Sequence, residues 1–264
     1  MPYANNHGVR IYYEVEGQGP PVVLAHGMGF GSNLNAWRST GYTDALRNDF
    51  QLILFDFRGH GRSDKSDDVS ASKSAPADDV VAVLDSLEII KAHYLGYSMG
   101  AAAGFRQAVR HADRFYSFIL GGMTPGKWPE EMVKAMEISA EWVKLRRTDP
   151  EAYFQQMEHL IGHPLTPEEK SELLTRDERA GNETLTPRHE RSELTPRELA
   201  GILVPCVLYC GSLDPFYAGA QESVQYMPRA AFISLDGLNH ITAFSRSDAV
   251  ARFVKPLLLR LSQL

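Results

Sequence analysis

Apolar and polar residues follow two different periods along the chain. Residues 21–25 and 51–55 are apolar in almost every position, which is typical of strands covered on both faces in a parallel sheet. Residues 9–16 alternate like a strand with one exposed face, and residues 77–90 carry apolar residues at helical spacing. The other predicted strands are residues 93–95, 115–120, 202–210 and 230–235, and the other predicted helices are residues 101–111, 219–226 and 249–264. This alternation predicts an α/β core with a mostly parallel sheet.

The middle of the chain has a different character. Residues 124–200 are polar, charged and helical in pattern, and threonine-proline pairs interrupt them, as at helix starts and turns. We therefore expect the core to consist of residues 1–123 and 201–264, with residues 124–200 as a helical insertion. Because no low-complexity linker flanks it, we interpret the insertion as a cap on the core rather than a second independent domain.

Composition and charge narrow the class of protein. The chain has 264 residues, 44% hydrophobic and 23% charged, with a formal net charge of −6, which indicates a globular protein without a broad nucleic-acid surface. Neither a leader segment nor an apolar stretch of membrane-spanning length is visible, so we expect no membrane partner. Cys206 and Cys210 lie on one predicted strand, about 13 Å apart, too far to pair. Two free thiols favour a cytoplasmic location.

Residues 96–100 read Gly-Tyr-Ser-Met-Gly and lie between a predicted strand and a predicted helix. This is the context of a nucleophile elbow, a tight turn that presents a serine at the start of a helix. Its flanking positions need small residues, and the positive end of the helix favours developing negative charge. The alternative is a structural turn with a capping serine. We predict that Ser98 is a nucleophile.

A serine hydroxyl needs a base and a group that orients the base. His240 follows the last predicted strand, and Asp214 follows the strand before it, so both belong at the carboxyl edge of the sheet. His60 is a rival base, but its glycine-rich setting favours a structural turn. Asp214 has the alternative of a helix cap. The predicted triad is Ser98, Asp214 and His240, in the chain order described for hydrolases of this elbow type.

The oxyanion of an acyl-transfer transition state needs backbone donors. The N–H of Met99 is one candidate, and the N–H of Met28, between two glycines in the loop after residues 21–25, is the other. The residues expected to line a substrate pocket are Phe30, Met123, Trp128 and Phe216. Packing within the insertion is the alternative for its apolar residues. With neither HExxH nor clustered His/Cys spacing in the sequence, we expect no metal and no cofactor.

These motifs together resemble the α/β-hydrolase superfamily, in particular its capped, single-domain, esterase-like members. The shared motifs are His26-Gly27-Met28-Gly29, the run from Asp56 to Ser63, the elbow, and the loops of Asp214 and His240. The resemblance implies an α/β-hydrolase fold with an eight-stranded, mostly parallel sheet and a cap after the sixth strand. It also implies a structural role for residues 56–63. Some members place the acid after the sixth strand, where residues 121–124 hold no carboxylate here. Serine at position 98 argues against relatives with an aspartate nucleophile.

The expected activity is hydrolysis of small to medium carboxylic esters through an acyl-enzyme, with a small-molecule ester as partner. A C–C bond hydrolase of a ring-cleavage product uses the same triad and stays an alternative, as do lactonase, amidase and perhydrolase activities. A ligand-sensing receptor that keeps the hydrolase fold is an alternative of another class. The sequence leaves the natural substrate and the oligomeric state open.

Overall fold

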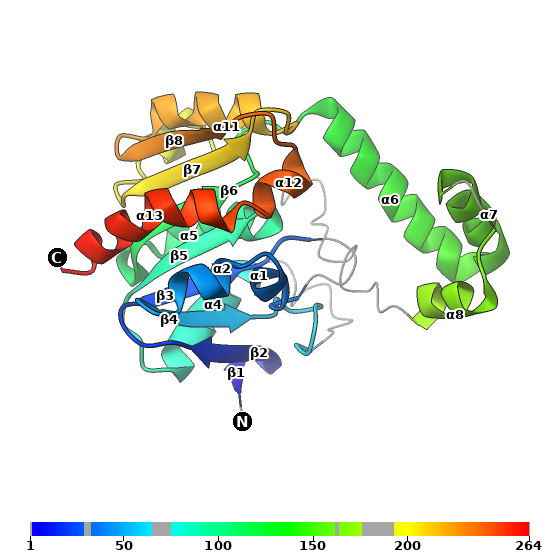
Figure 1. Ribbon diagram of the computed structural model, residues 1–264, viewed down its shortest axis with the longest axis horizontal. Coiled ribbons are helices and arrows are strands. Elements are labelled where there is room, and N and C mark those ends of the chain that lie inside the picture. The colour runs from blue at the N-terminus through cyan, green and yellow to red at the C-terminus, as the bar shows by residue number, and fades with distance from the viewer. Residues whose placement is uncertain (1, 29–32, 65–74, 162–163, 176–192, 264) are drawn as a thin grey trace.

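The strands form one twisted sheet at the centre of the molecule (Figure 1). The computed structural model describes residues 2–28, 33–64, 75–161, 164–175 and 193–263. Within these residues the sheet has eight strands in the order β1-β2-β4-β3-β5-β6-β7-β8. They are β1 (Tyr3–Asn6), β2 (Val9–Glu16), β3 (Pro21–Ala25), β4 (Gln51–Phe55), β5 (Ala92–Tyr97), β6 (Phe115–Gly121), β7 (Cys206–Gly211) and β8 (Ala230–Leu235).

Strand direction divides the sheet into two parts. The pairs β1–β2 and β2–β4 are antiparallel, and every pair from β4 to β8 is parallel. The carboxyl ends of the parallel strands therefore meet at one edge, where α/β proteins bind their ligands. The predicted fold class, a mostly parallel eight-stranded sheet flanked by helices, is confirmed.

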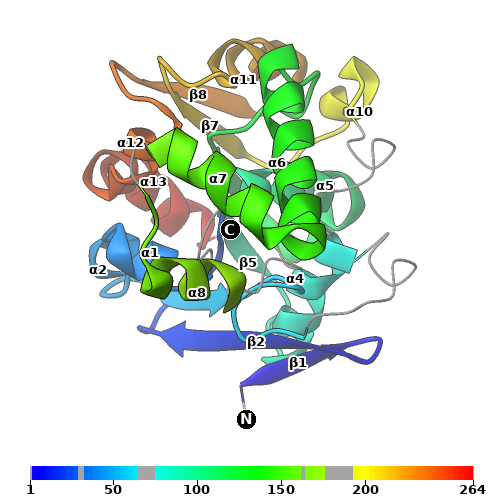
Figure 2. The same cartoon turned by 90° about the vertical axis from the view of Figure 1, so that its right-hand side faces the viewer.

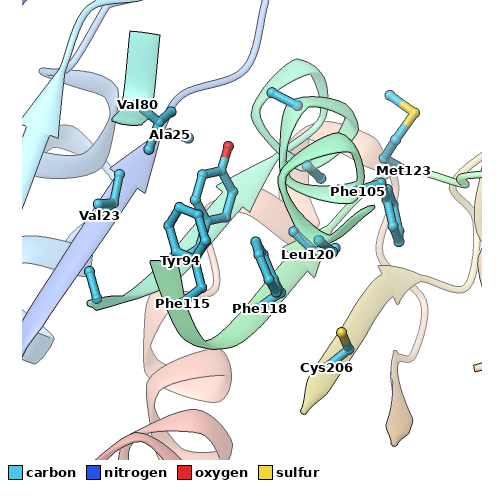
Figure 3. Close-up of a cluster of buried hydrophobic side chains, with 14 of the residues drawn as sticks. Val23, Ala25, Val80, Tyr94, Phe105, Phe115, Phe118, Leu120, Met123 and Cys206 are labelled. Carbon is cyan, nitrogen blue, oxygen red and sulfur yellow. The ribbon is translucent and has the colours of Figure 1, made fainter. Parts of the chain in front are cut away.

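Successive side chains of the central strands enter two separate cores, one on each face of the sheet. In β3, Val23 and Ala25 belong to one cluster, whereas Val22 and Leu24 belong to the other, as the period of two in a strand requires. Figure 3 shows part of the first cluster, in which Tyr94 and Phe118 lie under α5. Because both faces are covered, the strands read as continuous apolar runs.

Each face has its own set of helices. The face of Val23 is covered by α4 (Ala75–Ser86), α5 (Met99–Arg110) and α11 (Tyr217–Ser223). The opposite face is covered by α1 (Ala36–Ser39), α2 (Tyr42–Leu46), α12 (His240–Phe244) and α13 (Ser247–Leu261). Short 3-10 turns, η1 (Ala112–Arg114) and η2 (Val224–Tyr226), follow α5 and α11. No helix of the described residues is long and apolar enough to cross a bilayer.

Between β6 and β7 the chain leaves the sheet. Helix α6 (Glu130–Thr148) leads away from the core, and α7 (Pro150–Ile161) and α8 (Pro167–Thr175) lie at its far end (Figure 1). In the perpendicular view these three helices lie in front of the sheet (Figure 2). The last helix before β7, α10 (Pro196–Ala200), returns to the core, where Leu199 is buried. The domain limits and the role of this segment as a cap stay predictions.

Some observed boundaries differ from the predicted ones. Helix α4 ends at Ser86 rather than at residue 90, and Glu88 has a φ of 56°, a left-handed conformation that stops a helix. Strand β7 begins at Cys206 rather than at residue 202, because Pro205 has no N–H to donate to a ladder. Strand β1 was not predicted, since its four residues pair only at the edge of the sheet.

Candidate active site

Ser98 lies on the sharp turn between β5 and α5. Its φ of 54° and ψ of −115° lie outside the regions that residues other than glycine usually adopt. Such a conformation costs about 1–3 kcal/mol and persists only where its surroundings hold it. Here the Ser98 N–H donates to the Gly121 carbonyl at 2.8 Å, and the Ser98 carbonyl accepts from the Ala102 N–H at 2.9 Å.

The two glycines around Ser98 have steric reasons to be glycines. A Cβ at Gly96 would lie 2.5 Å from the Gly100 carbonyl oxygen, and a Cβ at Gly100 would lie 1.9 Å from the Ala25 carbonyl oxygen. At Gly27, in the loop after β3, a Cβ would lie 3.3 Å from the Ser98 Cβ. The turn and this loop are therefore in direct contact, and larger residues would push them apart.

The structure brings Ser98, Asp214 and His240 together at the carboxyl edge of the sheet. The His240 Nε2 lies 3.1 Å from the Ser98 Oγ, and the His240 Nδ1 lies 2.7 Å from Asp214 Oδ2. Asp214 follows β7, and its Oδ1 accepts a 3.0 Å hydrogen bond from the Phe216 N–H. Its side chain is 0% exposed, whereas that of His240 is 26% exposed. In the tautomer with the proton on Nδ1, His240 donates to the Asp214 carboxylate and turns the Nε2 lone pair towards the Ser98 hydroxyl.

His240 is the first residue of the short helix α12, and a capping box fixes the start of that helix. The Asn239 side chain accepts from the N–H groups of Ile241 and Thr242, each at 3.0 Å. In return, the Thr242 hydroxyl accepts from the Asn239 N–H at 2.9 Å. Because the cap sets the direction in which the chain enters the helix, it also sets the place of His240.

The predicted oxyanion donors belong to two segments, Met99 to the turn of Ser98 and Met28 to the loop after β3. Met99 is the first residue of α5, so its N–H has no partner within the helix. Met28 follows Gly27, whose backbone passes against Ser98. Their assignment as oxyanion donors stays a prediction, and Phe30 lies outside the described residues.

His26 anchors the loop that carries Met28. It is fully buried; its Nδ1 lies 2.7 Å from the Gly27 carbonyl oxygen, and its Nε2 accepts from the Phe57 N–H at 3.2 Å. Burial lowers the pKa of His26 to about 4. A neutral imidazole therefore ties the loop after β3 to the chain after β4.

Of the residues predicted to line a pocket, Phe216 and Trp128 lie beside the histidine. The Phe216 ring centroid is 5.8 Å from that of His240 and 5.4 Å from that of Trp128. Met123, just after β6, is buried in the cluster of Figure 3. Phe216 belongs to the same cluster. Their contact with a substrate stays a prediction.

His60 lies apart from the three residues at the sheet edge. It is buried; its ring is 5.2 Å from the His26 ring, and its Nδ1 lies 3.2 Å from the Arg58 carbonyl oxygen. These contacts are those of a packed side chain within the turn of residues 56–63. His240, not His60, lies within hydrogen-bond distance of the Ser98 hydroxyl, and its role as the base stays a prediction.

Sequence reasoning missed two residues that contact this site. The Tyr97 hydroxyl donates to the His240 carbonyl at 2.6 Å. Burial, followed by the charge of Asp214, raises the pKa of the Cys210 thiol, so Cys210 meets Asp214 as a neutral group. A strand-end tyrosine beside Ser98 was the one available signal, and its partner lies 143 positions away.

The sequence pattern of a known family extends over most of this chain. The model of the alpha/beta hydrolase family matches residues 22–253. The chain belongs to the alpha/beta hydrolase family. The family segment includes Ser98, Asp214 and His240 as well as the helices between β6 and β7.

Curated relatives within this hydrolase family carry different activities. A putative carbamate hydrolase, RutD, from Azorhizobium caulinodans is 35% identical over 120 residues, which are 46% of this chain and 43% of that protein. The 3-oxoadipate enol-lactonase 1 of Acinetobacter baylyi is 28% identical over 129 residues, 48% of this chain and 46% of that protein. The chain thus matches less than half the length of these relatives.

Solved structures match this chain over nearly its whole length. The enol-lactonase from Burkholderia xenovorans has a TM-score of 0.71 and 25% identity, covering 98% of this chain and 100% of that one. A thermophilic esterase from Thermogutta terrifontis has a TM-score of 0.74, covering 99% of this chain and 98% of that one. At 20% identity, the second likeness shows the fold alone.

Proposed function

We propose that the protein is a serine hydrolase that cleaves small to medium carboxylic esters through an acyl-enzyme on Ser98. One observation carries the proposal. A chain of hydrogen bonds runs from a buried carboxylate, Asp214, through His240 to a serine on a strained turn. A hydroxyl becomes a competent nucleophile when a base lies within hydrogen-bond reach and a third group orients that base.

In this mechanism each residue has one task. Ser98 attacks the ester carbonyl as His240 takes its proton, and Asp214 stabilises the imidazolium that forms. The N–H groups of Met28 and Met99 hold the oxyanion. His240 then returns the proton to the leaving alcohol and activates a water that releases the acid. General acid–base catalysis contributes about 10²–10⁴-fold, and one oxyanion donor contributes about 10²–10³-fold.

An aromatic wall favours esters with an apolar acyl or alcohol part. Trp128 and Phe216 pack edge to face, and Phe216 lies against His240. Apolar and aromatic linings with few polar groups are typical of small-molecule pockets. The two buried free thiols, Cys206 and Cys210, support a cytoplasmic location.

Lactone hydrolysis is the second candidate. A lactone is a cyclic ester, so the same attack and the same oxyanion donors serve both substrates. The observation that favours it is the likeness to the Burkholderia xenovorans enol-lactonase at 25% identity over 98% of this chain. Ring opening leaves the acyl and alcohol parts in one product.

A substrate panel tests the proposal. The purified protein is assayed with p-nitrophenyl acetate, butyrate and octanoate, with a γ-lactone, and with a ring-cleavage dienoate, each alongside the Ser98→Ala variant. We expect turnover of the short esters that the variant lacks, and no cleavage of the dienoate. Dienoate cleavage without ester turnover would replace the proposal by a C–C bond hydrolase. Turnover by Ser98→Ala at the wild-type rate would overturn the nucleophile.

A further inference from the structure

We infer that Tyr97 is a positioning residue for His240, whose backbone it holds where the imidazole reaches Ser98. The inference rests on the proposed function and deepens it. Tyr97 ends β5 and immediately precedes Ser98. Its side chain crosses to α12, where its hydroxyl donates to the His240 carbonyl at 2.6 Å. The serine and the histidine are therefore joined by two routes, the imidazole itself and the Tyr97 side chain.

The space for this side chain is made by a glycine. Gly122, just after β6, has a φ of 60°, and a Cβ there would lie 2.5 Å from the Tyr97 Cζ and 2.7 Å from its hydroxyl oxygen. Any larger residue at position 122 would displace the phenol. The end of β6 is thus shaped to let Tyr97 reach α12.

Tyr97 holds α12 at both of its ends. Besides the hydrogen bond at His240, the Tyr97 ring stacks on Phe244, the last residue of the helix, with centroids 4.6 Å apart. Tyr97 is 3% exposed, and burial raises the pKa of its phenol well above the usual range. The phenol therefore keeps its proton at neutral pH and can donate it to the His240 carbonyl.

Apart from the His240 ring, the other anchors of α12 lie towards its far end, where the Phe244 ring also contacts the rings of Trp37 and Tyr42, with centroids 5.2 and 5.8 Å away. Ala243 is its one buried residue, whereas Ile241 is 72% exposed. The capping box acts within residues 239–242 and does not tie them to the sheet. A shift of α12 by a few tenths of an ångström would change the distance of 3.1 Å between His240 Nε2 and Ser98 Oγ. The rate of proton transfer depends steeply on this distance.

Two substitutions test the inference from different directions. Tyr97→Phe keeps the ring and removes the hydroxyl. Gly122→Ala keeps the hydroxyl and displaces the ring. Each has a matched control. Tyr42→Phe removes a buried hydroxyl that lies 3.1 Å from the Tyr209 hydroxyl. Gly8→Ala places a methyl at another left-handed φ, 90°, where no atom lies within 4 Å.

The measurements are kcat, KM, the rate of labelling by a fluorophosphonate, and the melting temperature. We expect Tyr97→Phe to lower kcat and the labelling rate by about five- to tenfold with KM unchanged, and Gly122→Ala to lower both at least as much. The controls should keep wild-type kinetics even where their melting temperatures fall. A purely structural hydroxyl would change the melting temperature and leave kcat alone.

Either variant can overturn the inference. A folded Tyr97→Phe variant with wild-type kcat and labelling rate would contradict it, and so would a Gly122→Ala variant with wild-type kinetics. Either result would show that the Tyr97 side chain is not needed to position His240. These results leave the proposed function standing as long as Ser98→Ala abolishes labelling. Persistent labelling of Ser98→Ala would instead remove the proposed function itself.

Discussion

The sheet with its flanking helices and the helical segment of α6, α7 and α8 are held together in different ways. The sheet lies between two clusters of buried side chains, among which Trp37, Phe55 and Phe118 are fully covered. The helical segment has a cluster of its own, with Tyr153 and Phe154 as its buried members and partly buried neighbours around them. Figure 1 shows the distance that α6 puts between the two regions.

The proposed catalytic residues belong to the sheet region and not to the helical segment. Ser98, Asp214 and His240 follow closely on the ends of β5, β7 and β8, so we expect the closely packed sheet to fix their distances. Groups whose separation must be held to within about half an ångström need such a rigid support. The hydrogen bonds among Asp214, His240 and Ser98 involve none of the described residues of α6, α7 and α8, so we expect changes in the packing of these helices to leave the distances largely unchanged.

The largest expected effect falls on the sheet edge. Asp214→Asn places an amide against His240 Nδ1, and its N–H₂ group favours the tautomer with the proton on Nε2. That tautomer cannot accept the proton of Ser98, so we expect kcat for an ester to fall by about 10³–10⁴-fold while the fold is kept. Steady-state kinetics and a thermal melt measure both.

The matched control is Asp236→Asn, at an exposed aspartate in the loop before α12. It should keep kcat within about twofold. If Asp214→Asn retained more than a tenth of the wild-type kcat, a different carboxylate would have to orient His240.

Acid should weaken the sheet region through two buried histidines. Burial lowers the pKa of His26 and of His93 to about 4, from an ordinary value of 6.5. Between these values the unfolded chain binds protons that the folded protein does not, so stability is full above pH 6.5 and falls as the pH drops towards 4. We expect the free energy of unfolding to fall by about 2 kcal/mol per histidine from pH 7 to pH 5.

Urea unfolding at the two pH values measures this loss. His93→Gln should reduce it by the share of one histidine, because glutamine does not titrate and keeps polar atoms near the hydroxyls of Ser117 and Ser262. Equal free energies of unfolding for the wild-type protein at pH 7 and pH 5 would contradict the assignment of these histidines as buried and neutral.

The smallest effect should come from the helical segment. Phe154→Ala empties part of its cluster, so α6 and α7 should exchange their amide hydrogens faster. The urea unfolding of the sheet should change by less than about 1 kcal/mol, because the two clusters are separate. Hydrogen exchange measures the effect on α6 and α7, and urea unfolding of the same samples measures the effect on the sheet.

Phe118→Ala is the counterpart in the sheet, at a fully buried position. It should lower the free energy of unfolding by about 3–5 kcal/mol. Similar losses of unfolding free energy for the two variants would mean that the segment and the sheet unfold as one unit.

Local patterns predicted most of the sheet region. The strands predicted from the apolar runs (β3 and β4) and from the alternation (β2) have the observed bounds. Burial of one or both faces of a strand determines which of its neighbouring positions are apolar, so a short stretch of sequence is enough to predict it. The meeting of Ser98, Asp214 and His240 at one edge of the sheet followed from the same reasoning, since each comes just after a predicted strand.

What escaped prediction depends on contacts between distant residues. The bond from Tyr97 to His240 and the room that Gly122 leaves for it join three separate parts of the chain. Leu199, within the range assigned to the insertion, is buried in the sheet's core cluster. A spacing pattern carries no information on which element such a residue meets.

The most direct test of the account is to find the residue that a fluorophosphonate labels. Intact mass should show one adduct per chain, and peptide mass spectrometry should locate it on Ser98. Ser98→Ala should carry no adduct, while Ser212→Ala, at a serine of the Asp214 loop, should be labelled like the wild-type protein. An adduct on another residue, or undiminished labelling of Ser98→Ala, would contradict the assignment of Ser98 as the nucleophile.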